Sequence, residues 1–265
     1  MEWREADGVR WLEARLPGAT AAFSTRLGGV SEPPFDGLNL GVFTDDELDA
    51  VVENRRRLAA ALGFPPSRVA IARQVHGAEL AIHVGPQAPS PFAAPGGPIP
   101  EVDGHLTAEP DLALLVFVAD CVPVALSGPG GVAMLHCGWR GLASSGRAPG
   151  HTAEGSATAG LVADAVAATG ATDAAVGPSI GPCCYEVGDE VLDAFAGLGR
   201  GIASGQMLDL PEVARRLLLE AGVERVEVAG LCTSCEPDLF FSHRRDAGRT
   251  GRQAGLVWRG AGEAE

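Results

Sequence analysis

The sequence predicts an α/β (α+β) fold in which mixed β-sheets are layered with helices. Strand-like and helix-like segments alternate along the 265 residues. Apolar residues make up 46% and charged residues 20% of the chain, an ordinary balance for a globular protein. No shift in composition is sharp enough to divide the chain, so we expect a single domain over residues 1–265.

Four segments carry helical signals. Thr44 opens a capping-box pattern with Glu47, and apolar residues then recur at helical spacing until Gly63. Asp209 can cap a later helix, which should end at Gly222. The remaining two helices are expected over residues 158–169 and 189–196.

Short apolar runs bounded by Gly, Pro and polar residues predict six strands. Residues 112–119 are apolar on both faces, so their strand should be central and fully covered. The Pro/Gly-rich residues 85–100 and 144–157 are expected to form surface loops. The six strands are expected over residues 68–75, 79–84, 112–119, 132–137, 174–176 and 225–229.

The chain is acidic, with 34 Asp and Glu, 20 basic residues and a net charge of −14. Such a surface repels phosphate backbones and anionic lipids, so we expect neither nucleic acid nor a membrane as a partner. Every basic residue is Arg, and the absence of Lys excludes Schiff-base and P-loop lysine chemistry. An anionic substrate would have to be held by Arg or by backbone N–H groups.

The termini and apolar runs suggest a cytoplasmic protein. The N-terminal residues show no secretory signal pattern, and the longest apolar run, 112–119, is too short to span a bilayer. The six Cys residues are therefore expected to be ligands, nucleophiles or core residues rather than disulfides. The sequence leaves open whether the protein is a monomer or a homodimer.

His76, Cys121 and His136 each lie at the end of a predicted strand. Imidazole and thiolate suit Zn²⁺, and three protein ligands leave the fourth position open, as in a catalytic site. Cu²⁺ could also bind such a donor set. Their separations of 45 and 15 residues do not match a zinc finger. Capping histidines and a buried core cysteine are the alternative interpretation of the same residues.

Eight short motifs follow one another along nearly the whole chain. Three of them are Gln-Val-His-Gly at His76, Ala-Asp-Cys-Val-Pro at Cys121 and His-Cys-Gly-Trp-Arg-Gly from His136. In this order the motifs resemble the YfiH-like family, also called the laccase-domain or polyphenol-oxidase family. The eight motifs cover residues 23–31, 38–41, 74–77, 102–107, 119–123, 136–141, 177–187 and 231–245.

The resemblance implies a YfiH-like fold and zinc-associated purine nucleoside phosphorolysis. Adenosine, inosine and methylthioadenosine would be substrates together with phosphate, and adenosine deamination would accompany phosphorolysis. The family's metal-binding and catalytic positions fall on His76, Cys121 and His136. Peptidoglycan-precursor editing, to which some members are linked, is the alternative role. Residues 144–156 depart from the family pattern and resemble an insertion beside the site.

Five further residues are candidates for substrate binding. Arg26 and Arg140 could bind phosphate through a planar guanidinium, or could form surface ion pairs instead. Asp103 and Asp120 could orient a ligand imidazole or relay protons, although Asp120 could also cap a turn. Gln74 could recognise a purine edge or end a strand.

The remaining cysteines predict neither a closed four-ligand site with Cys137 nor a separate zinc site of their own. Cys137 should point away from His136 along an extended strand, which favours an open three-ligand site over a closed one. Cys183 and Cys184 are adjacent and are expected to be structural. Cys232 and Cys235 have C-x-x-C spacing, but one such pair alone does not predict zinc.

The histidine content argues against laccase chemistry. A four-copper oxidase needs about ten His ligands in imidazole-rich copper sites, and this chain has six His in total. The deaminase signatures H-x-E and P-C-x-x-C are absent from the sequence, so deamination would use a different scaffold.

Overall fold

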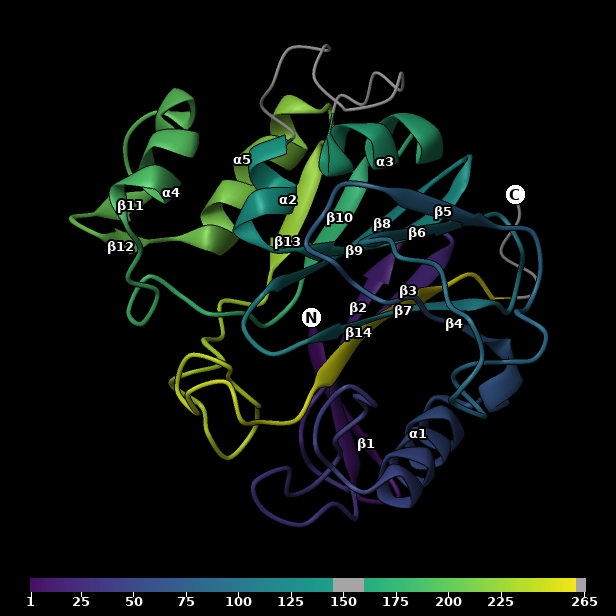
Figure 1. The fold of residues 1–265 in the computed structure, drawn as a ribbon. Helices are drawn as coiled ribbons and strands as arrows, with labels where there is room; N and C mark the ends of the chain where they lie inside the picture. The colour runs from purple at the N-terminus through teal and green to yellow at the C-terminus, as the bar shows by residue number, and fades with distance from the viewer. Residues whose placement is uncertain (145–159, 261–265) are drawn as a thin grey trace.

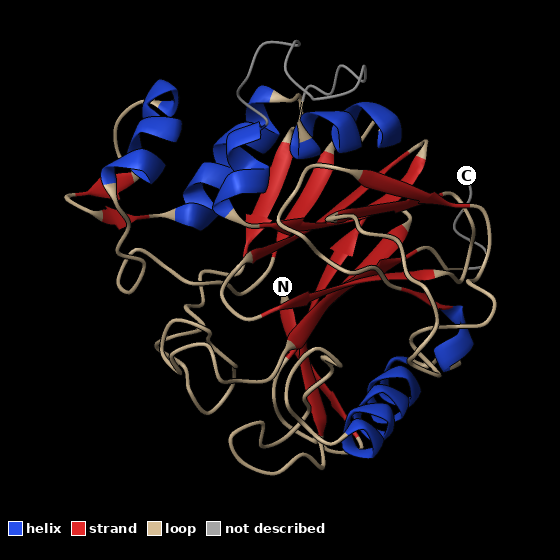
Figure 2. Cartoon of the chain, viewed as in Figure 1, coloured by secondary structure: helices blue, strands red, loops and turns tan. Residues whose placement is uncertain are grey.

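Two six-stranded sheets lie face to face between helices on either outer side, so the molecule has four layers (Figures 1 and 2). The computed structural model describes residues 1–144 and 160–260. The predicted layering of mixed sheets with helices is confirmed, since both sheets contain parallel and antiparallel pairs. Within the described ranges, no helix is both long and apolar enough to cross a bilayer.

The first sheet has the strand order β1-β2-β3-β14-β7-β4. Its N-terminal strands form an antiparallel meander, and the C-terminal strand inserts between β3 and β7. Helix α1 (Leu48–Leu62) covers the outer face with Leu58 and Ala59. The strands are β1 (Glu2–Ala6), β2 (Val9–Leu16), β3 (Ala19–Ser24), β4 (Val69–Ala70), β7 (Ala113–Val118) and β14 (Gln253–Trp258).

The second sheet has the order β13-β10-β8-β9-β6-β5. Its strands are β5 (Leu80–His83), β6 (Gly104–Thr107), β8 (Val122–Gly128), β9 (Gly131–Cys137), β10 (Asp173–Val176) and β13 (Arg225–Val228). Three helices cover its outer face, namely α2 (Trp139–Ser144), α3 (Leu161–Thr169) and α5 (Leu210–Glu220). The other elements are α4 (Asp189–Ala194), a hairpin of β11 (Ala203–Ser204) and β12 (Met207–Leu208), and the 3₁₀ turns Pro66–Arg68 and Ala196–Leu198.

Strand β7 packs with one face against the core between the two sheets and with the other against the core beneath α1. Leu114 and Val116 face the second sheet and contact the inner core with Met134, while Leu115 packs on the side of α1. The strand predicted at 112–119 is therefore buried on both faces. It is flanked by β14 and by the two-residue strand β4, so it lies next to the edge of its sheet rather than at the centre.

Most of the predicted helices and strands have counterparts. The helix from Asp209 is confirmed, because the Asp209 carboxylate accepts the Glu212 backbone N–H at 3.0 Å. Residues 85–100 form no helix or strand, as expected. The proposed insertion at 144–156 lies, apart from Ser144, outside the described residues.

The predicted capping box at Thr44 is wrong. Helix α1 begins at Leu48 with Glu47 as its N-cap and no side-chain capping bond. The Thr44 hydroxyl instead donates to the Gly41 carbonyl at 2.8 Å, within the turn that precedes the helix. A side chain committed to that turn is not available to cap the helix.

The strand predicted over 68–75 is too long. Only Val69 and Ala70 pair with β7, and a 3₁₀ turn precedes them. Beyond this point side chains replace the sheet ladder: Gln74 both accepts from and donates to the Phe117 backbone, at 2.8 and 2.6 Å. The following residues are thereby free to turn toward the second sheet.

A buried histidine pair predicts sensitivity of the fold to acid. His83 Nε2 and His105 Nδ1 lie 2.9 Å apart. Burial, together with the charge of His83 and against the effect of Asp103, lowers the pKa of His105 to about 3. Burial also lowers the pKa of His83. Below about pH 6.5 both histidines become protonated in the unfolded chain but stay neutral in the folded protein. The free energy of unfolding therefore decreases as pH drops below this value.

Replacing His105 with Phe should weaken this dependence. Each histidine that stays neutral on folding contributes a slope of up to about 1.4 kcal/mol per pH unit below pH 6.5. Urea unfolding of wild type and His105→Phe between pH 7.5 and 5 would measure the difference. Parallel curves for the two proteins would contradict this role of His105.

Candidate active site

His76, Cys121 and His136 come together where the two sheets meet. His76 follows β4 of the first sheet, Cys121 lies in the crossing from β7 to β8, and His136 is near the end of β9. Their donor atoms all lie within 4.8 Å of one another. Cys121 Sγ is 3.8 Å from His76 Nε2, and the two imidazole rings meet edge to face with centroids 4.9 Å apart.

The local backbone is bent to hold these side chains. His76 has φ 60° and Asp120 has φ 99°, values in the left-handed region that residues with a Cβ rarely adopt. Gly138 makes room for the His76 ring, because a Cβ at this position would lie 2.8 Å from His76 Cδ2. The site is therefore built on backbone conformations that surrounding contacts must stabilise.

Asp103 supplies much of this support. It is completely buried, and its carboxylate accepts the backbone N–H groups of Val75, His76 and Gly77 at 3.1, 2.9 and 2.6 Å. Its Oδ1 also lies 2.7 Å from His136 Nδ1. Because Asp103 engages Nδ1, the Nε2 atom of His136 is left to face Cys121. Asp103 is thus a positioning residue for both histidines rather than a group open to substrate.

Asp120 has a similar structural role on the other side. Its carboxylate accepts the Thr233 hydroxyl and the Arg244 backbone N–H, both at 2.6 Å. These bonds hold its left-handed conformation and tie the loop before Cys121 to the segment from 233 to 244. Both carboxylate oxygens are therefore engaged within the protein.

Cys121 and His136 form a charged pair. Burial opposes ionisation of the Cys121 thiol, but the neighbouring His136 and His76 lower its pKa overall. Burial likewise opposes protonation of His136, yet the Cys121 thiolate and Asp103 raise its pKa. The pKa of Asp103 is lowered because His136 and the backbone N–H groups outweigh the effect of burial. At neutral pH the site therefore favours a thiolate, which is both a nucleophile and a metal ligand.

The chemistry of the donor set fits a metal ion. Tetrahedral zinc, with Zn–S about 2.3 Å and Zn–N about 2.05 Å, would place sulfur and nitrogen ligands about 3.6 Å apart. The 3.8 Å between Cys121 and His76 is close to this separation. Cys137 faces the outer core of the second sheet, so it is not a fourth ligand in this arrangement. Assignment of the three residues as ligands stays a prediction.

A cavity of about 600 Å³ opens beside this group. Its volume is typical of small-molecule sites. Aliphatic and aromatic residues line much of it, namely Val42, Phe43, Ile71, Ile99, Phe117, Trp139, Ile180 and Tyr185. His76, Cys121 and His136 all contribute to the wall, so a ligand in the cavity would lie against them.

Five arginines also line the cavity, and only Arg73 forms an ion pair within the described residues, with Glu101. The other four are called the arginine cluster: Arg55, Arg140, Arg244 and Arg252. Arg55 is 1% exposed and its Nη2 has no hydrogen-bond partner in the described part of the chain. An unpaired cationic group in a cavity favours an anionic or hydrogen-bond-accepting ligand.

Of the two arginines that the sequence suggests for phosphate binding, Arg140 lines the cavity and Arg26 does not. Arg140 lines the cavity, with its guanidinium over the Trp139 ring at 4.4 Å. Arg26 does not line the cavity: its guanidinium bonds the Asp36 carboxylate at 2.8 Å and the Pro237 carbonyl at 3.0 Å. For Arg26 the alternative interpretation, a surface ion pair, therefore fits better than phosphate binding, because its donors tie surface loops together.

Gln74 lines the cavity, but its amide is fully engaged with the Phe117 backbone. The interpretation in which it supports a strand therefore fits better than recognition of a purine edge. Arg55, Arg244 and Arg252 were missed by sequence reasoning. Arg244 lies in a motif that carries the family resemblance, which is the one signal that could have identified it.

Residues 20–260 match the family model described as multi-copper polyphenol oxidoreductase laccase. The chain belongs to this family. It is 39% identical to the purine nucleoside phosphorylase YlmD of Geobacillus stearothermophilus, with 97% of this chain and 96% of the relative covered. A purine nucleoside phosphorylase of Deinococcus radiodurans is 40% identical, with coverages of 95% and 94%.

Solved structures support the same assignment to the laccase-domain family. The YfiH protein of Bacillus licheniformis has a TM-score of 0.82 and 34% sequence identity, and the match covers 97% of this chain and 98% of that one. The family is described by copper oxidase chemistry, whereas the two relatives named above are purine nucleoside phosphorylases. The sequence has six histidines, and among the described residues His83 and His105 pair with each other rather than line the cavity, which argues against a four-copper centre.

Proposed function

We propose that this laccase-domain protein is a purine nucleoside phosphorylase. Its substrates are adenosine, inosine and methylthioadenosine, together with phosphate. The observation that carries the proposal is the arginine cluster, which places unpaired cations in the same cavity as His76, Cys121 and His136. In a chain of net charge −14, such a local concentration of positive charge indicates an anionic substrate. The names of the relatives support phosphorolysis.

Phosphate binding is assigned to the rim of the cavity. Arg140 and Arg244 line the same cavity as Tyr185 and Cys121. Arg244 stacks on the Tyr185 ring with its guanidinium 5.2 Å from the centroid. Two planar guanidinium groups can hold phosphate through paired N–H bonds beside the thiolate.

The nucleoside is assigned to the apolar wall. Ile71, Phe117 and Ile180 offer contacts that suit both a purine ring and the methylthio group of methylthioadenosine. The buried guanidinium of Arg55 stacks on Phe117 in the same wall and contributes positive charge on this side of the cavity. The side chains thus hold both reactants in one cavity.

The reaction requires an in-line approach of phosphate to the sugar. A phosphate oxygen bonds to C1′ as the bond from C1′ to the purine nitrogen breaks. The electron pair leaves on the base, which takes up the proton that the attacking hydrogen phosphate loses. The products are the free purine and ribose 1-phosphate, or methylthioribose 1-phosphate from methylthioadenosine. Arg140 and Arg244 orient the phosphate and balance its charge. A zinc ion held by His76, Cys121 and His136 would supply further positive charge at this point.

Adenosine deamination is proposed as a side activity of the same cavity. Water replaces phosphate and adds to the amino-bearing ring carbon, and ammonia leaves as inosine forms. Arg140 and Arg244, which hold phosphate, have no part in this reaction, so deamination should not depend on phosphate. Phosphorolysis and deamination can therefore be distinguished by adding or omitting phosphate.

Product analysis with and without phosphate tests the proposal. With adenosine saturating, wild type should form adenine and ribose 1-phosphate only when phosphate is present. Arg140→Ala should raise the KM for phosphate by about 10- to 100-fold, since one charge-assisted bidentate contact is lost. Arg140→Lys should recover only part of this loss, because an ammonium group cannot reproduce the fork.

Arg26→Ala is the matched control, because Arg26 lies outside the cavity wall. It should leave the KM for phosphate unchanged. Inosine formation at the same rate with and without phosphate, and no ribose 1-phosphate, would make deamination the principal reaction. Absence of any nucleoside turnover would reject the proposal and favour the peptidoglycan-precursor hydrolase.

A further inference from the structure

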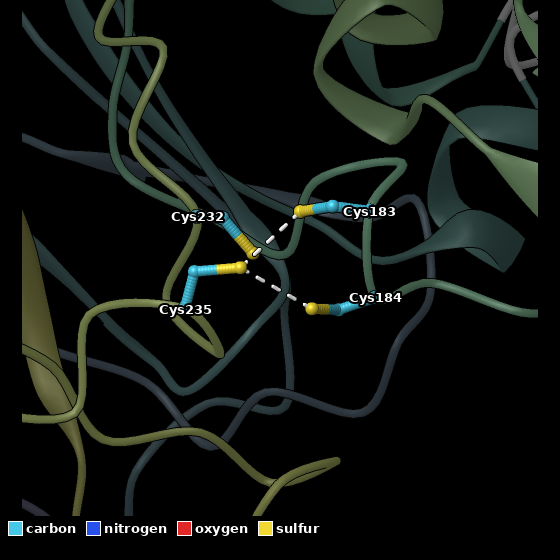
Figure 3. Close-up of side chains that lie close together, drawn as sticks. All are labelled: Cys183, Cys184, Cys232 and Cys235. Atoms are coloured by element: carbon cyan, nitrogen blue, oxygen red, sulfur yellow. Dashed lines mark hydrogen bonds between the residues drawn. The ribbon is translucent and has the colours of Figure 1, made fainter.

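Two pairs of cysteines from distant parts of the sequence gather at the surface as a group separate from the first ligand candidates. The four-cysteine cluster consists of Cys183, Cys184, Cys232 and Cys235, and all four side chains point toward one centre (Figure 3). All four Sγ atoms lie within 4.8 Å of one another. Cys235 Sγ is 3.4 Å from both Cys183 Sγ and Cys184 Sγ.

These distances match a tetrahedron of thiolates around one ion. With Zn–S about 2.3 Å, tetrahedral geometry sets the sulfur–sulfur separation at about 3.8 Å. A disulfide would instead join two particular sulfurs at about 2.05 Å. Cys235 is equally distant from two partners, so the geometry does not select one pair. We propose that the four-cysteine cluster binds a structural zinc ion.

The backbone around the cluster supports thiolate ligands. Two turns present the cysteines: Cys184 N–H donates to Gly181 O at 3.0 Å, and Cys235 N–H donates to Cys232 O at 3.1 Å. Gly181 N–H also donates to Cys232 Sγ at 3.3 Å. The Gly181 N–H, which donates to sulfur, stabilises part of the negative charge that accumulates when four thiolates share one divalent ion.

Pairing between the two segments brings the turns together. Ser179 and Cys232 form a parallel bridge, in which Ser179 N–H donates to Leu231 O and Thr233 N–H donates to Ser179 O. The first turn leads into Tyr185 and the second contains Thr233, which holds Asp120. A bound ion would thus fasten one wall of the cavity to the loop that carries Cys121.

Metal analysis of the full-length protein tests this second site. The first site is removed with Cys121→Ala, so that any remaining ion is assigned to the four-cysteine cluster. Purified Cys121→Ala should hold one zinc per chain, and Cys121→Ala with Cys235→Ser should lose it. Ser234→Ala in the Cys121→Ala background is the matched control in the same turn and should keep the ion.

Cobalt substitution provides a readout that needs no destabilising change. Co²⁺ in the Cys121→Ala protein should give a sulfur-to-cobalt charge-transfer band of an intensity that corresponds to four thiolates. Cys183→Ser, at an exposed ligand, should lower this intensity even if Cys235→Ser fails to fold. The metal content is independent of phosphorylase activity, so the two proposals can fail separately.

Three outcomes would overturn the proposal. The first is a Cys121→Ala protein that contains no metal after expression with added zinc. The second is mass spectrometry after alkylation that finds a disulfide within the cluster. The third is a Cys235→Ser variant that folds and keeps a full equivalent of zinc.

Discussion

Cys121→Ala should abolish phosphorolysis while the fold persists. The thiolate is the shared member of the site, since both His76 and His136 act on it. Its removal deletes a metal ligand or a nucleophile in either interpretation, and kcat/KM with adenosine and phosphate should fall at least about 10³-fold. The side chain is small and half-buried in a loop, so its loss should cost only about 1 kcal/mol of folding free energy.

Cys137→Ala is the matched control for this experiment. Cys137 adjoins His136 in the sequence but is buried in the outer core of the second sheet. The control should lower the unfolding midpoint and keep kcat/KM within a few-fold of wild type. Equal activity in wild type and Cys121→Ala would remove Cys121 from the catalytic group.

Asp103→Asn should have the largest effect on stability. Each carboxylate oxygen accepts two donors, so an amide nitrogen in either orientation would face two N–H groups. Breaking a buried charged network in this way costs about 3–5 kcal/mol. Urea unfolding followed by tryptophan fluorescence would measure the loss, and zinc affinity should fall by about 10- to 100-fold because His136 loses its orienting partner.

Asp173→Asn provides the comparison for Asp103. Asp173 pairs with the exposed side chain of Arg225, at 2.6 Å. An ion pair open to solvent contributes little to stability. The urea midpoint of Asp173→Asn should therefore change much less than that of Asp103→Asn. If Asp103→Asn unfolds at the same urea concentration as wild type, the buried carboxylate is not the support inferred from its bonds.

The elements that the sequence predicts well are those with strong local signals. The strands at 132–137 and 174–176 correspond to β9 and β10 because apolar runs between turn residues are unambiguous. The N-terminal meander was missed. The residues of β1 are mostly exposed and charged, and β3 is rich in Ala, so neither shows the usual strand composition.

Predictions about the site depended on the family resemblance more than on spacing. Motifs brought His76, Cys121 and His136 to attention, whereas only the fold shows that they are neighbours. Arg55 was not recognised because it stands in a run of three arginines on α1, and sequence does not reveal which one is buried. Cys183 and Cys232 are 49 residues apart, and the bridge that unites their turns leaves no local pattern.

The position of the site at the junction of the two sheets makes its geometry a sensitive indicator of how the layers are aligned. His76 lies in the loop that leaves the first sheet after β4 and is held by Asp103 next to β6 of the second sheet. His136 lies in β9 of the second sheet, and Cys121 lies in the crossing from β7 to β8. A slide of one layer over the other would pull on the loop after β4 and on the β7–β8 crossing, and so displace His76 and Cys121 while every strand kept its own ladder. On heating, we therefore expect inactivation to precede the loss of secondary structure, as layer alignment is lost before the sheets themselves melt.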